Sequence, residues 1–139
     1  MERLQLEFSI ESPNIDEQHT DGESIENYVL RLAESKAKNV AEKYSNSIVI
    51  GSDQALECDG VIFGKPSDYE NAKQQLMAMS NKTMTFHTGL CVMNSSKDKS
   101  EKDVISFRVC FRRLEEQEIE DYLHKEQPYS CVGSFMSER

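Results

Sequence analysis

Apolar residues recur with helical spacing between residues 25 and 44. Placed at about 100° per residue, they form one stripe that would face a core. Ser24 precedes the stripe and has a side chain suited to a helix N-cap. The pattern therefore predicts a long amphipathic helix whose stripe holds Ile25, Tyr28, Val29, Leu32, Ala33 and Val40.

Two shorter helices are predicted further along the chain. Ser67-Asp68-Tyr69-Glu70 has the form of a capping box, with Ser at the cap and Glu three residues later. The helix that it opens would turn Ala72, Leu76 and Met79 inward. Residues 116–125 predict the last helix, with Ile119, Tyr122 and Leu123 on one side.

Strand-like runs separate these helices. Residues 47–50 predict a short buried strand that ends at Gly51-Ser52-Asp53-Gln54. Asp59-Gly60 stands between strand-like residues 56–58 and 61–63. An Asp-Gly pair suits a type I′ turn, because both turn positions need positive φ, so this segment predicts a hairpin.

Two longer strands are expected at residues 83–93 and 105–112, and the second alternates with period two. The polar residues 94–102 between them predict an exposed loop. Shorter strand-like pieces occur at residues 4–10 and 131–139. The alternation of strands and helices, without a linker, favours one α/β domain over residues 1–139.

Composition narrows the choice of partners. The chain has 139 residues, enough for one core, and a formal net charge of −9. A nucleic acid or an anionic membrane surface rewards a basic protein, so we expect neither as a partner. Neither a membrane-spanning run nor a leader is recognisable, so we expect a cytoplasmic location.

The residues that usually bind soft metals are scattered. The four cysteines form no C-x-x-C pair, and the three histidines are equally far apart. This spacing fits neither a disulfide framework nor a zinc site. Any metal ion would therefore be a hard cation held by carboxylates.

Asp53 is the first candidate for chemistry. Ligands of open α/β sheets gather beyond the carboxyl ends of strands, where a carboxylate can orient a water or hold a divalent cation. The alternative is that Asp53 caps the following turn. Glu17, in an acidic pair with Asp16, is either part of a solvated loop or a second carboxylate for the same cation.

Two lysines are candidates for anion binding. Lys36 lies in the middle of the apolar stripe. One alternative is that its stem packs on the core while the ammonium reaches the solvent; the other is that the ammonium enters a cleft and binds an anion. Lys65 stands between Gly64 and Pro66, in a stiff turn before a helix, which suits a phosphate contact. The chain has no phosphate loop, dinucleotide fingerprint or nucleophile elbow.

Taken together, these segments resemble the Maf family of nucleotide pyrophosphatases, and within it the YceF-type branch. The matching strings, in chain order, are Pro13-Asn14-Ile15-Asp16-Glu17, Tyr28-Val29-Leu30-Arg31-Leu32-Ala33, Lys36-Ala37, Ile48-Val49-Ile50-Gly51-Ser52-Asp53-Gln54, Gly64-Lys65-Pro66, Thr85-Phe86-His87-Thr88-Gly89-Leu90, Val109-Cys110-Phe111-Arg112 and Gly133-Ser134-Phe135. They cover essentially the whole chain, and their specificity comes from their joint order.

The resemblance implies a Maf/ITPase-like mixed sheet flanked by helices. It also implies hydrolysis of a nucleoside triphosphate between its α- and β-phosphates, assisted by Mg²⁺ or Mn²⁺. By the same resemblance, Asp53 matches the proton acceptor and, with Glu17, would hold the metal ion. Lys36 and Lys65 match lysines that face the phosphates.

Two further positions match residues that select the base. Gln54 follows the aspartate where the branch acting on 7-methyl-GTP has Gln, and Glu138 lies where the family varies a second such residue. A carboxylate there would accept hydrogen bonds from the donor edge of a guanine. The family often forms dimers, so a homodimer is compatible with the resemblance.

The chain departs from the family pattern at both ends. The family begins with a strand and an S-x-S-P-x-R loop that binds phosphate, and Met1 aligns after that loop. The chain also stops before the closing strands and helix of the family fold. We therefore weigh three hypotheses: an active pyrophosphatase, a catalytically impaired remnant that binds a nucleotide or a protein, and a generic α/β domain.

Overall fold

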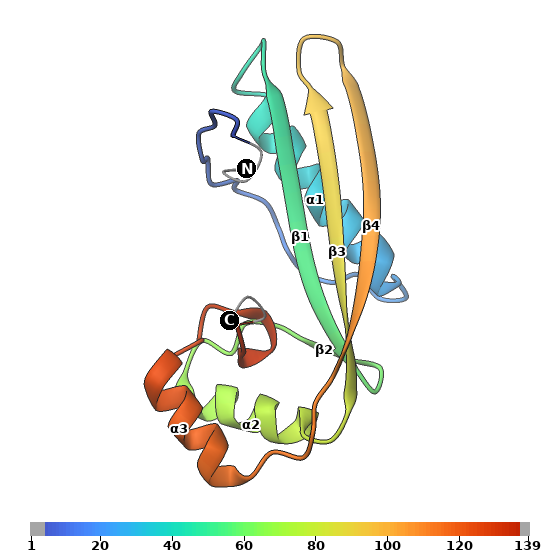
Figure 1. The fold of residues 1–139 in the computed structure, drawn as a ribbon. Helices are drawn as coiled ribbons and strands as arrows, with labels where there is room; N and C mark the ends of the chain where they lie inside the picture. The colour runs from blue at the N-terminus through green and yellow to red at the C-terminus, as the bar shows by residue number, and fades with distance from the viewer. Residues whose placement is uncertain (1–4, 137–139) are drawn as a thin grey trace.

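The computed structural model describes residues 5–136, which form one sheet with helices packed against it (Figure 1). The strands are β1 (Ile48–Cys58), β2 (Val61–Phe63), β3 (Thr83–Asn94) and β4 (Lys99–Cys110). The helices are α1 (Ile25–Ala41), α2 (Tyr69–Met79) and α3 (Glu116–Glu126), with a 3₁₀ turn at Val132–Ser134. The predicted α/β class is confirmed.

The strand order is β2-β1-β3-β4, and every pairing among the described strands is antiparallel. The predicted hairpin is confirmed: Asp59 and Gly60 connect β1 to β2 with φ values of 52° and 78°. The predicted loop at residues 94–102 is shorter than expected. Only residues 95–98 form the turn, because β4 already begins at Lys99 and pairs with Asn94.

The strand that carries Asp53 is much longer than predicted. β1 does not end before Gly51, because its pairing with β3 continues without interruption from Ile48 to Glu57. Nor is it buried on both faces: Val49 is buried, whereas Ile48 and Ile50 are exposed. A short apolar run does not reveal how far a ladder extends, since pairing partners lie elsewhere in the chain.

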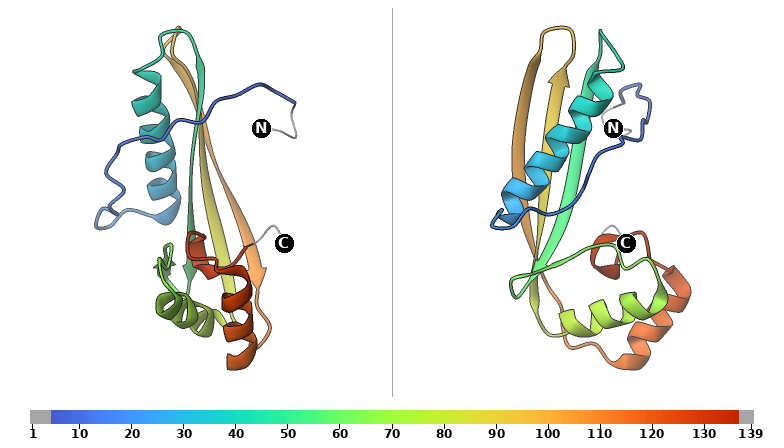
Figure 2. Two further views of the ribbon diagram at one scale, coloured as in Figure 1. Left: turned by 90° about the vertical axis from the view of Figure 1, so that its left-hand side faces the viewer. Right: turned by 180° about the vertical axis from the view of Figure 1, so that it is seen from behind.

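Helix α1 lies along one face of β1 and β3 (Figure 2). A Cβ at Gly51 would collide with the backbone of Ala33 and Ala37, and one at Gly89 with the backbone of Val29. The two glycines therefore let the helix backbone approach the sheet directly. Around this contact, Ala33, Ala37, Val49 and Cys91 form a small buried cluster.

The hairpin end of the sheet carries the second, larger core. Leu56 and Cys58 of β1 alternate with the residues that face α1, so their side chains point to the opposite face. Helices α2 and α3 cover this end of the sheet (Figure 1). The buried members of the cluster are Leu56, Cys58, Ala72, Leu76, Met79, Met84, Phe86, Ile119 and Leu123.

The helix predictions hold with small corrections. Ser24 caps α1 by accepting a hydrogen bond from the amide of Asn27, and α1 ends at Ala41 rather than residue 44. The cap of α2 is Asp68, whose carboxylate accepts from the amide of Asn71, and not Ser67.

Two predicted strands are wrong within the described residues. Residues 5–10 form no strand, and residues 131–136 contain the 3₁₀ turn in place of a strand. Alternating apolar residues form a strand only where a partner edge is available. Within residues 5–136 no helix is long and apolar enough to cross a bilayer.

Candidate functional site

The ammonium of Lys36 joins three segments that are far apart in the chain. Its Nζ donates to Oδ1 of Asp53 at 2.6 Å and lies 2.9 Å from Oε1 of Glu17. Lys36 comes from α1, Asp53 from the middle of β1, and Glu17 from the irregular segment before α1. We call these three residues the Lys36 cluster.

Close packing of α1 on the sheet explains this meeting. Gly51 lies beneath Ala33 and Ala37, and Asp53 follows two residues later on the same face of β1. Lys36, adjacent to Ala37, therefore projects over the Asp53 carboxylate. Asp53 lies in mid-strand opposite Gly89, so it neither stands at a strand end nor caps a turn.

The cluster is buried on one side and open on the other. The side chains of Lys36 and Asp53 are 18% and 14% exposed, whereas that of Glu17 is 57% exposed. Burial lowers the pKa of Lys36, but hydrogen bonds and charges from Asp53 and Glu17 outweigh burial and leave the pKa above its ordinary value. Lys36 therefore stays charged, and two carboxylates around one ammonium leave the cluster with one excess negative charge.

The cluster offers a divalent cation two carboxylate groups. Both carboxylates already converge on one cationic atom, the Lys36 Nζ, and hard cations prefer such oxygen ligands. Within residues 5–136, no group of three or more His, Cys, Asp and Glu side chains could hold a metal ion. A cation at Glu17 and Asp53 would therefore need water or substrate oxygens to complete its coordination.

Lys65 does not join the cluster. No hydrogen bond or ion pair of residues 5–136 connects Lys65 to Asp53, Lys36 or Glu17. It lines a hollow of about 440 Å³ between β2 and the polar face of α2. The other lining residues are Val61, Ile62, Phe63, Gly64, Pro66, Asn71, Gln74, Gln75 and Ala78.

Of the two predicted base-selecting residues, the structure describes Gln54, which does not join the Lys36 cluster. Gln54 is exposed on the sheet face opposite Asp53, where its Nε2 donates to Oγ1 of Thr88 at 2.9 Å. Neighbouring residues of a strand point to opposite faces of the sheet, so the side chains of Asp53 and Gln54 lie on opposite faces. Glu138 lies outside the described residues.

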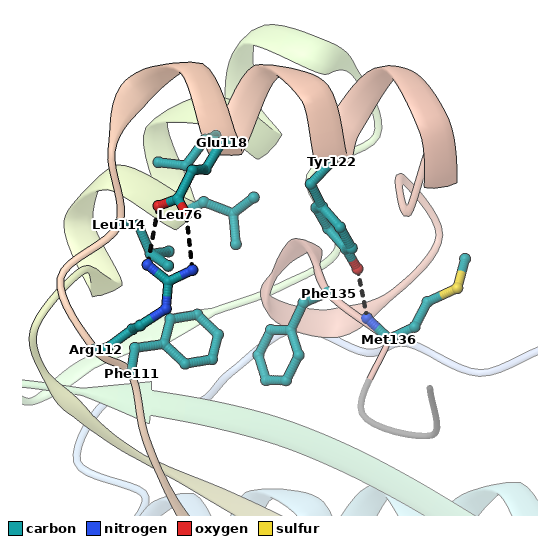
Figure 3. Close-up of a pocket in the computed structure, with 9 residues that line it drawn as sticks. Leu76, Phe111, Arg112, Leu114, Glu118, Tyr122, Phe135 and Met136 are labelled. Atoms are coloured by element: carbon teal, nitrogen blue, oxygen red, sulfur yellow. Dashed lines mark hydrogen bonds and ion pairs between the residues drawn. The ribbon is translucent and has the colours of Figure 1, made fainter.

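A separate apolar hollow of about 270 Å³ lies between the end of β4 and α3 (Figure 3). Its polar groups are engaged within the protein: Arg112 donates twice to the carboxylate of Glu118, at 2.9 and 2.8 Å. Arg112 lowers the pKa of Glu118 to about 2. Phe111 and Phe135 form much of the remaining wall. This hollow therefore lacks the free charges that a phosphate would need.

His87 is a buried polar residue whose surroundings the sequence did not predict. It lies on the α1 face of β3, two residues from Gly89, and its Nδ1 is 2.9 Å from Oγ of Ser106. Its Nε2 is 3.4 Å from a Glu57 carboxylate oxygen and has no hydrogen-bond partner among the described residues. The string Thr85-Phe86-His87-Thr88-Gly89 marked this segment, but only the fold shows its acidic neighbours.

Comparison with known proteins identifies the family that this chain resembles. The family described as Maf-like protein matches residues 1–139. The 7-methyl-GTP pyrophosphatase of Methylobacillus flagellatus is 48% identical over 136 residues, covering 98% of this chain and 71% of the relative. The 7-methyl-GTP pyrophosphatase of Colwellia psychrerythraea is 48% identical over 138 residues, covering 99% of this chain and 69% of the relative. The 7-methyl-GTP pyrophosphatase of Idiomarina loihiensis is 46% identical over 140 residues, covering 99% of this chain and 71% of the relative.

Proposed function

Because this chain belongs to the Maf family, we propose that it is a nucleoside triphosphate pyrophosphatase, a hydrolase acting on acid anhydrides. It cleaves the bond between the α- and β-phosphates and releases a nucleoside monophosphate and pyrophosphate. The relatives are named for 7-methyl-GTP, which we take as the preferred substrate. The observation that supports this function most directly is the Lys36 cluster.

Asp53 serves as the proton acceptor. Its carboxylate is nearly buried beside an ammonium and can accept the proton of a water that attacks one phosphorus of the α–β anhydride. As the new P–O bond forms, the P–O bond between the attacked phosphorus and the bridging oxygen breaks, and the nucleoside monophosphate and pyrophosphate separate. Lys36 stays charged and offsets negative charge on the phosphate oxygens, so both residues act at the reacting groups.

Glu17 and Asp53 would hold Mg²⁺ or Mn²⁺, with water and phosphate oxygens filling the remaining positions. Such an ion polarises phosphoryl oxygens and neutralises part of the triphosphate charge. Without that neutralisation, a protein with a net charge of −9 would repel a polyphosphate.

Lys65 contributes a second ammonium for the phosphates. It follows Gly64 in the turn before α2, and α2 begins at Tyr69. The N-terminus of α2 carries the positive end of the helix dipole, where the Asp68 carboxylate accepts from the amide of Asn71. Lys65 would therefore bind the part of the polyphosphate that extends away from the Lys36 cluster.

Gln54 and Glu138 select the base. Since Gln54 and Asp53 face opposite sides of β1, a substrate that contacts both must reach around the strand edge. Within residues 5–136 no strand pairs with residues 48–55 of β1 on that edge, because β2 pairs only with residues 56–58. The base would lie on the Gln54 side and the phosphates on the Asp53 side.

We place the protein in the cytoplasm, with a homodimer as the assembly that the family favours. The net charge of −9 argues against nucleic acid or an anionic membrane as a partner. The nucleotide is thus the principal ligand.

The test is pyrophosphate release from 7-methyl-GTP, GTP, ATP, dTTP and UTP, each with Mg²⁺ or Mn²⁺. We expect 7-methyl-GTP to give the highest kcat/KM, and Asp53→Asn to reduce turnover of every substrate. Nucleotide binding without pyrophosphate release would instead support a binding module that has lost catalysis. Full turnover by Asp53→Asn would refute the assignment of the proton acceptor.

A further inference from the structure

The segment that carries Glu17 has no regular secondary structure. Residues 6–20 form neither helix nor strand, so backbone ladders do not hold Glu17 beside Lys36. An irregular segment keeps one conformation only where other groups form hydrogen bonds with its backbone N–H and C=O groups. The source of those groups is α1, which lies alongside (Figure 2).

Two contacts hold the segment on either side of Glu17. The amide nitrogen of Asn14 donates to Oδ1 of Asn39 at 3.1 Å, and Nδ2 of Asn39 donates back to the Asn14 carbonyl at 3.4 Å. Beyond Glu17, Nη2 of Arg31 donates to the Gln18 carbonyl at 2.9 Å. The segment therefore runs antiparallel to α1, with its earlier residue beside the end of the helix.

The spacing of these contacts fits an extended strap. Asn39 and Arg31, the partners of Asn14 and Gln18, are separated by eight residues of helix, which is about 12 Å along the axis. An extended chain from Asn14 to Gln18 spans about 13 Å. The segment is thus nearly fully stretched between its attachments, and small losses of contact would allow it to move away.

Tyr28 makes the contact at Glu17 itself. Its hydroxyl donates to the Glu17 carbonyl at 2.8 Å, on the residue whose carboxylate meets Lys36. Burial raises the pKa of Tyr28, and the charges of Asp53 and Glu17 raise it further, so the phenol keeps its proton. The ring also packs against His19 at 5.0 Å and lies under the guanidinium of Arg31.

We propose that Tyr28 is a positioning residue that fixes the main chain of Glu17, so that the Glu17 carboxylate faces Lys36 and Asp53. In this role Tyr28 acts through Glu17, whose carbonyl oxygen accepts a hydrogen bond from the Tyr28 hydroxyl. The part of the inference that concerns cation binding rests on the proposed function. The contact between Tyr28 and Glu17 does not, because it exists in the protein alone.

The variant Tyr28→Phe removes one oxygen and keeps the ring. We expect the Glu17 carboxylate to leave Lys36 more often, which raises the half-saturating Mn²⁺ concentration and the KM for 7-methyl-GTP about three- to tenfold, a loss comparable to that of one hydrogen bond. The kcat should change less than about twofold, because Asp53 and Lys36 keep their own contact. Tyr44→Phe is the matched control, since among residues 5–136 the Tyr44 hydroxyl hydrogen-bonds only to Glu11, at 3.4 Å.

Two measurements separate positioning from a general loss of stability. In Tyr28→Phe, amide hydrogen exchange should become several-fold faster in peptides covering residues 13–23 and stay unchanged in β1 and β3. The same change made on Glu17→Gln should have little further effect on the Mn²⁺ requirement, because the contact that it would weaken is already lost.

Unchanged exchange over residues 13–23 in Tyr28→Phe would overturn the inference. So would full additivity of Tyr28→Phe and Glu17→Gln in the Mn²⁺ titration. If even the unmodified chain releases no pyrophosphate, the proposed function fails, and hydrogen exchange alone then decides the role of Tyr28.

Discussion

The Asp53 carboxylate accepts a 2.6 Å hydrogen bond from the Lys36 ammonium across the contact between β1 and α1. This pair joins a central strand to the helix that covers it, at a depth where both side chains are largely buried. Removing either member leaves the other without its closest partner of opposite charge. Function and stability are therefore coupled at this contact.

Asp53→Asn should reduce kcat at least about 100-fold, because an amide cannot accept the proton that a general base removes. The amide oxygen still accepts from Lys36, so the melting temperature should change little. Asp121→Asn is the control, since Asp121 is exposed on α3 and, in the part of the chain that the structure describes, its carboxylate hydrogen-bonds only to Gln117. Pyrophosphate release and thermal unfolding, measured on both variants, check this prediction.

Lys36→Met should damage both activity and stability. It keeps the length of the stem but leaves the Asp53 carboxylate, only 14% exposed, without its ammonium. Breaking such a pair costs about 3–5 kcal/mol when the partner is fully buried, and we expect about 1–3 kcal/mol here because water reaches the Glu17 side. Urea unfolding measures the loss. A double variant with Asp53→Leu should recover part of the stability without recovering turnover.

The sequence predicted the helices and strands better than the contacts between them. Helical periodicity located all three helices, because each buries one stripe. Asp53 was selected on the expectation of a strand end, yet it lies in mid-strand, since the ladder with β3 extends past Gly51. The resemblance assigned Asp53 and Lys36 to one site, but their direct contact was not predicted, because it depends on how closely α1 approaches the sheet.

Other features depend on chain paths that local patterns do not encode. The hydroxyl of Tyr28 meets Glu17 only because an irregular segment runs back along α1. Lys65 was grouped with Asp53 and Lys36, but the turn after β2 directs it to another hollow. The spacing of residues in sequence gave no information on either outcome.

Gly51→Ala should destabilise the protein by about 1–3 kcal/mol, as overpacking of a close contact does. A Cβ at this position collides with the backbone of Ala33 and Ala37, so α1 must move away from the sheet. Because this shift separates Lys36 from Asp53, activity should fall as well. Gly64→Ala is the control, since a Cβ there meets no atom within 4 Å. Equal unfolding midpoints for the two variants would contradict this account of the packing.

The pair of Arg112 and Glu118 should contribute to stability in a pH-dependent way. Hydrogen bonds from Arg112 and, to a lesser extent, from the backbone amide of Glu115 lower the pKa of Glu118 from 4.5 to about 2, so ionisation of Glu118 stabilises the folded state. A lowered pKa stabilises the folded state at pH values above the pKa of the unfolded chain. This stabilisation is lost as the pH falls from 4.5 through 2. Glu118→Gln should therefore lower the melting temperature by no more than about 4 °C at pH 7, because the pair is exposed. The difference should vanish near pH 2 and persist at pH 5.5; a difference independent of pH would contradict the electrostatic origin.

Chelation should separate catalysis from folding. In the absence of a metal ion, the carboxylates of Glu17 and Asp53 are already neutralised in part by Lys36, so EDTA should abolish pyrophosphate release while changing the melting temperature by less than about 2 °C.

Adding Mn²⁺ to the chelated protein should restore turnover. It should raise the melting temperature only slightly, because the stabilisation grows only with the logarithm of one plus the ratio of the ion concentration to its dissociation constant. In Glu17→Gln the restoration should need a higher Mn²⁺ concentration, whereas Glu11→Gln, which alters an exposed carboxylate paired with Lys43, should behave as the unmodified chain. Turnover that survives EDTA at full rate would show that Lys36 and Lys65 alone neutralise the polyphosphate, and the carboxylate pair would then have no role in holding a cation.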